Sequence, residues 1–174
     1  MKVLFDEHKV IISAIDIAKK VNNKLMVTNE IKYENIIRQL ILFFRLYADG
    51  YHHYKEEEIL FPEMTKRNEL LKEGVIKEML DNHKEFRLIL TSIETFLDKK
   101  DYLGASQRLN QYSEMLLNHI AVENDELFQM GKTLFSEDEI TKICFRFEDY
   151  DREFGELQKN KLTNQLKEIK NQFQ

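Results

Sequence analysis

The stretch HHYKEEEILFP, residues 52–62, places two histidines and three glutamates close together in the chain. On a helix, side chains four residues apart lie on the same face, which pairs His52 with Glu56 and His53 with Glu57. Both pairs have the spacing of metal ligands. Adjacent residues of an α-helix are about 100° apart around its axis, so the question is which pair faces inward.

Two observations favour the His52 pair. The residues four, eight and eleven positions before His52 are all apolar, whereas those before His53 include an aspartate and an arginine. The stretch HIAVENDELF, residues 119–128, also repeats the H-x-x-x-E-x-x-x-L-F pattern that starts at His52. The sequence therefore predicts an internal repeat in which His52 and Glu56 face inward, while His53 and Glu57 sit at the edge of that face.

Helical spacing of apolar residues extends over almost the whole chain of 174 residues, which contains five glycines and one proline. The pattern predicts four long helices and a shorter fifth one, with breaks in VNNKLMVTNE, TKRNELLKEG, KKDYLG and just before Ser136. Short breaks are typical of antiparallel neighbours. The predicted fold class is therefore all-α: an up-down-up-down four-helix bundle with an additional C-terminal helix.

Local signals predict several helix ends. Asp101 is the predicted N-cap of the fourth helix, and Ser136 with Glu139 is predicted to form a capping box for the fifth. Pro62 is expected to kink or stop the second helix.

The domain organisation is simple. Residues 1–160 are expected to form a single metal-binding bundle, and the polar residues 161–174 a C-terminal tail that frays or packs loosely.

Composition bears on the partners and the compartment. A net charge of −5 gives no reason to expect nucleic acid or an anionic membrane as a partner. The single cysteine, Cys144, cannot form an internal disulfide, which favours a reducing compartment. The first residues lack the long apolar region of a signal peptide, and no apolar run approaches the roughly 20 residues needed to span a bilayer. We therefore expect a cytoplasmic protein.

Each of the four predicted long helices carries one histidine in its apolar stripe: His8, His52, His83 and His119. In an antiparallel hairpin, two residues lie level when the turn falls midway between them. The three midpoints fall at residue 30, between residues 67 and 68, and at residue 101, all within the predicted breaks. A single buried histidine is usually a core residue with one hydrogen bond, but four at one level predict a common site.

Two carboxylates join this layer, because Glu56 follows His52 by four residues and Glu123 follows His119 by four. The acidic surroundings also suit a solvated helix face, but buried unpaired glutamates are costly, and a cation between them would remove that cost. Six ligands are too many for one tetrahedral zinc ion and suit two metal ions bridged by the carboxylates and a small oxygen ligand. Mixed nitrogen and oxygen ligands favour iron, and manganese or zinc would also suit.

The motifs DEHKVI, HHYKEEEILFP, DNHKEF and HIAVENDELF follow one another in this order. With them, the sequence resembles the hemerythrin-like HHE family of cation-binding proteins over roughly residues 1–154. The resemblance implies a four-helix bundle around a non-haem diiron centre. It also implies ligand roles for the same six residues: His8, His52, Glu56, His83, His119 and Glu123.

One feature departs from the hemerythrin pattern. True hemerythrins have a fifth histidine one turn from the ligand on the third helix, where this chain has Met79 and Arg87 on either side of His83. Water, a tyrosine, a glutamate or His53 could fill that position. The departure argues against simple reversible oxygen carriage, which depends on one crowded and one open iron.

The predicted function is a diiron-binding module that binds, senses or turns over a small ligand, namely dioxygen, nitric oxide or peroxide. The alternative is iron storage or delivery, or iron–sulfur cluster repair under oxidative or nitrosative stress. A third alternative is a metal-free bundle whose buried polar layer specifies the helix register. The sequence does not decide whether the protein is an enzyme.

Overall fold

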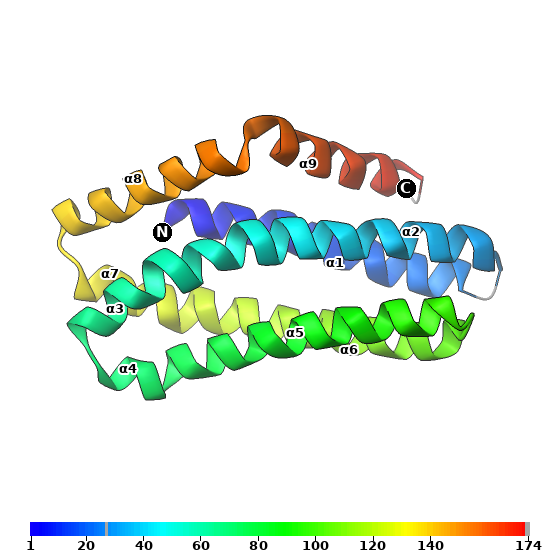
Figure 1. Ribbon diagram of the computed structural model, residues 1–174, viewed down its shortest axis with the longest axis horizontal. Helices are drawn as coiled ribbons and strands as arrows, with labels where there is room; N and C mark the ends of the chain where they lie inside the picture. The colour runs from blue at the N-terminus through cyan, green and yellow to red at the C-terminus, as the bar shows by residue number, and fades with distance from the viewer. Residues whose placement is uncertain (27, 173–174) are drawn as a thin grey trace.

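The computed structural model describes residues 1–26 and 28–172, and it shows four long helical segments running alternately up and down (Figure 1). The first segment is α1 (Lys2–Leu25), and the third is α5 (Val75–Asp98), preceded by the short α4 (Leu70–Glu73). The second joins α2 (Glu30–Phe43), η1 (Phe44–His53), η2 (Glu56–Leu60) and α3 (Phe61–Arg67). The fourth joins α6 (Tyr102–Val122), η3 (Glu123–Leu127) and α7 (Phe128–Leu134). The predicted all-α bundle is confirmed, and no β-strand occurs in the described residues.

The predicted helix caps are present. The Asp101 side chain accepts a hydrogen bond from the N–H of Gly104, which begins α6. Ser136 and Glu139 form the reciprocal capping box that begins α8 (Glu137–Phe154). These side chains satisfy backbone N–H groups that have no partner inside the helix, so they fix where the two helices start.

Three π-helical segments interrupt the second and fourth long helices. In them Tyr54, Phe61 and Phe128 each donate their backbone N–H to a carbonyl five residues back rather than four. Such segments are rare and occur often at functional sites, because the wider turn changes which residues face inward. Glu56–Leu60 and Glu123–Leu127, the Glu-to-Leu parts of the predicted internal repeat, are both π-helical.

Pro62 does not stop the second helix, which continues to Arg67. A proline lacks the N–H that would bind the carbonyl four residues back, here that of Glu58. Arg146 in α8 supplies the missing donor, with its Nη2 lying 3.2 Å from the Glu58 oxygen. The contact with α8 thus satisfies the backbone group that the proline leaves free.

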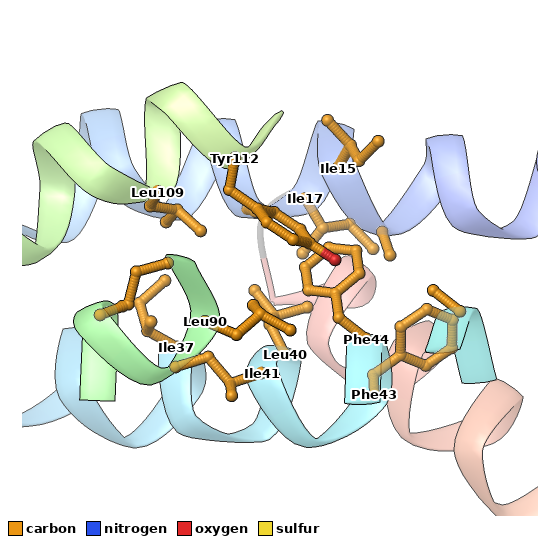
Figure 2. Packing of buried hydrophobic residues seen from close by; sticks show 14 of the residues in the cluster. Ile15, Ile17, Ile37, Leu40, Ile41, Phe43, Phe44, Leu90, Leu109 and Tyr112 are labelled. Atoms are coloured by element: carbon orange, nitrogen blue, oxygen red, sulfur yellow. The ribbon is translucent and has the colours of Figure 1, made fainter. Parts of the chain in front are cut away.

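The apolar interior forms two clusters with the histidine level between them. The larger cluster fills the half of the bundle nearer the α1–α2 and α5–α6 turns, and Figure 2 shows part of it, with Tyr112 from α6 reaching toward Phe44. Their rings meet edge to face at 4.9 Å. The smaller cluster, which includes Leu4, Leu60 and Leu127, fills the other half. The polar layer is therefore closed by apolar side chains at both ends.

The C-terminal region differs from the expected single helix with a loose tail. It forms two helices, α8 and α9 (Glu156–Asn171), separated at Gly155, whose φ of +91° is strained for any other residue. Both lie on the same side of the bundle, where α9 packs against α1 and α2, and α8 packs against η2 of the second long segment (Figure 1). Residues 161–171 belong to α9, which buries Leu162, Leu166 and Ile169, so apolar packing holds most of the expected tail in place.

None of the helices in the described residues is both long enough and apolar enough to cross a membrane.

Candidate metal centre

The structure brings all six predicted residues into one layer. Each side chain is at most 2 % exposed, and the layer draws on all four long helices. The six are His8 from α1, His52 from η1, Glu56 from η2, His83 from α5, His119 from α6 and Glu123 from η3.

The ligand atoms form two groups, within each of which they lie no more than 4.8 Å apart. The first group consists of His8, His52, Glu56 and Glu123. The second consists of His53, Glu56, His83 and His119. Each group has the number and types of donor atoms that could hold a metal ion.

His53 does not lie at the edge of the inward face, as the sequence predicted, but is 2 % exposed and belongs to the second group. The reason is the π-helix η1, which ends at His53. The prediction assumed regular α-helical rotation, and the wider π turn brings both adjacent histidines into the buried layer. Of the four candidates for the fifth ligand, the structure places His53 beside the other two rings.

The two glutamates lie between the two groups. Glu123 places one carboxylate oxygen 3.2 Å from Nε2 of His8 and the other 3.2 Å from Nε2 of His119. Glu56 is 3.4 Å from Nε2 of His52 through Oε1 and 3.7 Å from Nε2 of His83 through Oε2. Each carboxylate thus faces one ring of each group, as a bridging ligand does.

The carboxylate oxygens test whether a cation fits. All four oxygens of Glu56 and Glu123 are buried, and none has a hydrogen-bond partner within the described part of the chain. Buried carboxylates without partners are strongly unfavourable, and a positive ion at the same point removes the penalty. The Nε2 atoms of His8 and His52 also converge, 2.8 Å apart, and those of His83 and His119 are 3.1 Å apart. The residues present therefore fit metal ions.

The outer nitrogen of four rings faces an oxygen that orients the ring. In the first group, Nδ1 of His8 lies 2.8 Å from Oδ1 of Asn124, and Nδ1 of His52 lies 2.9 Å from a carboxylate oxygen of Glu7. In the second group, Nδ1 of His83 lies 2.7 Å from Glu57, and Nδ1 of His53 lies 3.4 Å from Asp49. These oxygens can only accept, so Nδ1 carries the ring proton and Nε2 keeps a lone pair for a metal ion.

The internal repeat makes two matching sets of contacts in its two copies. The residue after each inner glutamate, Glu57 or Asn124, accepts from Nδ1 of a histidine on another helix. The phenylalanine that ends each copy stacks on that same histidine, Phe61 on His83 at 6.2 Å and Phe128 on His8 at 5.4 Å. The internal repeat predicted from the sequence therefore extends to the residues around the ligands.

The carboxylates that orient the histidine rings are themselves paired with cationic side chains. Arg87 donates to Asp49 at 2.8 Å and to Glu57 at 2.7 Å, and it is 40 % exposed. Lys55, which is fully buried, donates to Glu7 at 2.6 Å.

Sequence reasoning missed Glu7 and Lys55, although a signal for both is present. Glu7 follows Leu4 by three residues and precedes Ile11 by four, and Lys55 lies four residues from both Tyr51 and Ile59. A charged residue at the helical spacing of the apolar residues is expected to be buried, and a buried charge needs a partner of opposite sign. Glu7 and Lys55 provide this partner for each other.

Burial keeps three of the rings neutral. Desolvation, with the nearby His8, lowers the pKa of His52 to about 4. Desolvation beside His83 lowers the pKa of His53 to about 3, and desolvation beside His119 lowers that of His83 to about 3. These rings are unprotonated at pH 7, which is the form that binds a metal ion.

The two inner carboxyl groups have opposite pKa shifts. Burial and the adjacent Glu123 raise the pKa of Glu56 well above its ordinary value. Burial also acts to raise the pKa of Glu123, but the neighbouring rings of His119 and His8 outweigh it and hold that pKa well below normal. In the metal-free protein one carboxyl is therefore neutral and the other ionised, because two like charges so close together cannot both persist.

Comparison with known proteins agrees with this site. The family model of the Hemerythrin HHE cation binding domain matches residues 1–131. No curated protein and no solved structure gives a significant match. The matched region contains every histidine and both inner glutamates. Because the match spans most of the chain, the protein belongs to the hemerythrin HHE cation-binding family.

Proposed function

We propose that the protein binds two iron ions between its four long helices and uses them to bind, sense or turn over a small ligand. The observation that carries the proposal is the pair of buried glutamates, which lack hydrogen-bond partners among the described residues and each face both histidine groups. Two positions that share carboxylate ligands are typical of bundle sites with two metals. Mixed imidazole and carboxylate donors favour iron, with manganese or zinc as alternatives.

The two positions differ in their number of histidine rings. His53, His83 and His119 surround one position, whereas His8 and His52 are the only rings of the other group. The position with two rings has room for an external ligand. The sequence argument against simple oxygen carriage depended on a missing fifth histidine, and His53 removes that argument.

The surroundings favour a small and weakly polar ligand. Phe128 stacks on His8, and Leu4, Leu60 and Leu127, all fully buried, lie in the apolar cluster beyond the layer. Side chains this tightly packed leave little space for anything larger than a few atoms. The expected ligand is therefore dioxygen, nitric oxide or peroxide, and iron would supply its reversible binding or its redox conversion.

Iron storage, delivery or cluster repair requires metal that leaves readily. Here all seven candidate ligands are at most 2 % exposed, and four of the rings are oriented by further side chains. This burial favours a resident metal over a cargo metal.

Metal analysis of the freshly purified protein tests the proposal. We expect about two iron ions per chain and a thermal midpoint that falls when a strong chelator removes them. Dioxygen, nitric oxide and peroxide are then added separately to the anaerobic ferrous protein, and absorption spectra are recorded. Less than about one metal ion per chain, with a midpoint that chelation does not change, would refute the diiron proposal. Rapid loss of iron to a weak chelator would instead support the storage alternative.

A further inference from the structure

Lys55 is an unusual residue for the interior of a bundle. Its side chain is 0 % exposed, and its ammonium group lies 3.9 Å from the centre of the Tyr51 ring. Two carboxylates neutralise it, Glu7 at 2.6 Å and Asp151 at 2.5 Å. A buried ammonium group is stable only with such partners, so the positions of all three side chains are coupled.

Glu7 connects this ion pair to the metal centre. Its Oε1 accepts from Lys55, while its Oε2 lies 2.9 Å from Nδ1 of His52. One carboxylate therefore orients a candidate ligand with one oxygen and is itself fixed through the other. The result is a continuous chain from Asp151 through Lys55 and Glu7 to His52.

Asp151 lies in α8, outside the residues that match the family. It also accepts from the hydroxyl of Tyr51 at 2.7 Å, and that hydroxyl receives a hydrogen bond from Lys159 of α9 at 2.5 Å. The two C-terminal helices are thus connected by polar contacts to the first ligand group. This connection is separate from their apolar packing, which uses other residues such as Ile143 and Leu166.

The second ligand group has no such connection. Asp49 and Glu57 orient its rings and are held by Arg87, and all three residues belong to the long helices of the bundle. Over residues 1–26 and 28–172, no hydrogen bond or ion pair joins these three side chains to α8 or α9. The chain of polar side chains that starts at Asp151 therefore reaches one metal position and not the other.

We propose that Asp151 is a positioning residue for the His8–His52 metal position, acting through Lys55 and Glu7 on the ring of His52. In this proposal the two C-terminal helices do more than pack against the bundle, because α8 helps to position a metal ligand. The inference rests on the proposed function, because it requires metal at this position.

Asp151→Asn removes the charge that faces Lys55 while keeping the size of the side chain. Asp149→Asn is the matched control, since Asp149 lies on the same helix, is 67 % exposed and, within the described part of the chain, has an ion pair with Arg152 alone. Anaerobic titration of each metal-free chain with Fe²⁺, in competition with a chromophoric chelator, resolves the two binding events. We expect Asp151→Asn to weaken one event by about 10- to 100-fold and leave the other unchanged, which is the range for loss of a residue behind a ligand. Asp149→Asn should match the unaltered protein, and Asp151→Glu should recover part of the loss.

Two further variants separate positioning from simple loss of stability. Ile143→Ala loosens the packing of α8 without changing the polar chain, since Ile143 is 5 % exposed and lies in the smaller apolar cluster. It should lower the denaturation midpoint and leave both affinities intact. In a Lys55→Met background, Asp151→Asn should have no further effect on Fe²⁺ affinity, because the group that couples it to Glu7 is gone. If Asp151→Asn does not fold, Lys55→Met alone is compared with the unaltered protein and should weaken the same single event.

Two results would overturn the inference. One is equal Fe²⁺ affinity in Asp151→Asn and Asp149→Asn, with two metals bound in both, which would leave the proposed function standing. The other is an equal loss in Ile143→Ala and Asp151→Asn, which would make the role of Asp151 structural. Absence of metal binding by the unaltered protein would refute the proposed function and this inference together.

Discussion

At the scale of single residues, the two inner glutamates destabilise the metal-free fold and favour the binding of metal ions. Glu56 and Glu123 are fully buried, and their oxygens lack hydrogen-bond partners within the described chain. A fold that needed no cation would gain from replacing them by neutral side chains. Their presence is therefore best explained by the ions that they are positioned to hold.

Two of the three adjacent glutamates, residues 56–58, give a matched pair of variants that tests both effects, on stability and on metal binding. Glu56→Gln should raise the unfolding free energy of the metal-free protein by roughly 1–3 kcal/mol, since the buried Glu56 carboxyl must take up a proton when this chain folds at neutral pH and a glutamine needs none. The same change should greatly reduce metal content. Glu58→Gln, two residues away and exposed, should alter neither quantity. Urea denaturation of the chelated proteins and elemental analysis of the untreated ones measure the two effects, and a Glu56→Gln chain that keeps its full metal content would count against the bridging assignment.

His53 is the residue on which the sequence and the structure differ most directly. His53→Ala should lower metal content from about two ions to about one per chain, because it removes one of three rings at its position. Tyr54→Ala, at the next residue and 41 % exposed, is the control and should keep both ions. Elemental analysis after gel filtration distinguishes the two cases. Unchanged metal content in His53→Ala would show that this ring is no ligand.

At the scale of the elements, the π-helical segments decide which side chains meet. Adjacent histidines 52 and 53 both reach the layer because η1 has wider turns than an α-helix. The segments η2 and η3 begin at Glu56 and Glu123 and are followed by the phenylalanines that stack on histidines. Local helix geometry therefore sets the composition of the site.

The capping box of α8 gives a prediction at this scale. Ser136→Ala should lower the unfolding free energy by about 1 kcal/mol, since it removes the acceptor for the N–H of Glu139. Ser136→Gly should lower the unfolding free energy by only a few tenths of a kcal/mol, because glycine is tolerated at this position. Chemical denaturation compares the two variants. An unchanged unfolding free energy in Ser136→Ala would show that the cap contributes little to the stability of α8.

At the scale of the whole molecule, two apolar clusters enclose one polar layer. The clusters stabilise the bundle on either side, while the layer between them contains groups that ionise. Stability of the metal-free protein must therefore depend on pH through this layer.

The direction of that dependence follows from the pKa shifts. The folded-state pKa values of His52, His53 and His83 are lowered from 6.5 to about 4, 3 and 3, so below pH 6.5 only the unfolded chain binds these three protons. The raised pKa of Glu56 acts in the opposite direction by one proton, since its carboxyl is already protonated in the folded state. The unfolded chain therefore binds about two more protons than the folded one. As a result, the unfolding free energy decreases by ~2.7 kcal/mol for each unit by which the pH falls.

We expect this loss between about pH 6 and pH 4.5 in chelated protein, because those values lie below the unfolded-state pKa of histidine and above that of glutamate. Urea denaturation at intervals of half a pH unit measures it. The metal-loaded protein should resist the first part of this change, since protons must then displace the ions from Nε2. A flat profile across this range would show that the rings are protonated in the folded state.

Much of the molecule is predictable from the sequence. The fold class, the breaks, the caps at Asp101 and Ser136 and the single layer of four histidines all follow from periodicity and turn chemistry. These features are local or depend on spacing along one chain. For the same reason the i,i+4 pairs of His52 with Glu56 and His119 with Glu123 are predictable from helical spacing alone.

Residue spacing along the chain was enough to predict the bundle and six of the residues in its polar layer. Three further features are visible only in the folded chain: His53 joins the layer, Glu7 and Lys55 form a buried pair, and Asp151 contacts that pair from α8. The physical reason is that π-helical turns and long-range ion pairs arise from packing between helices. Lys55 and Asp151 are 96 positions apart, and no periodicity in the sequence relates them.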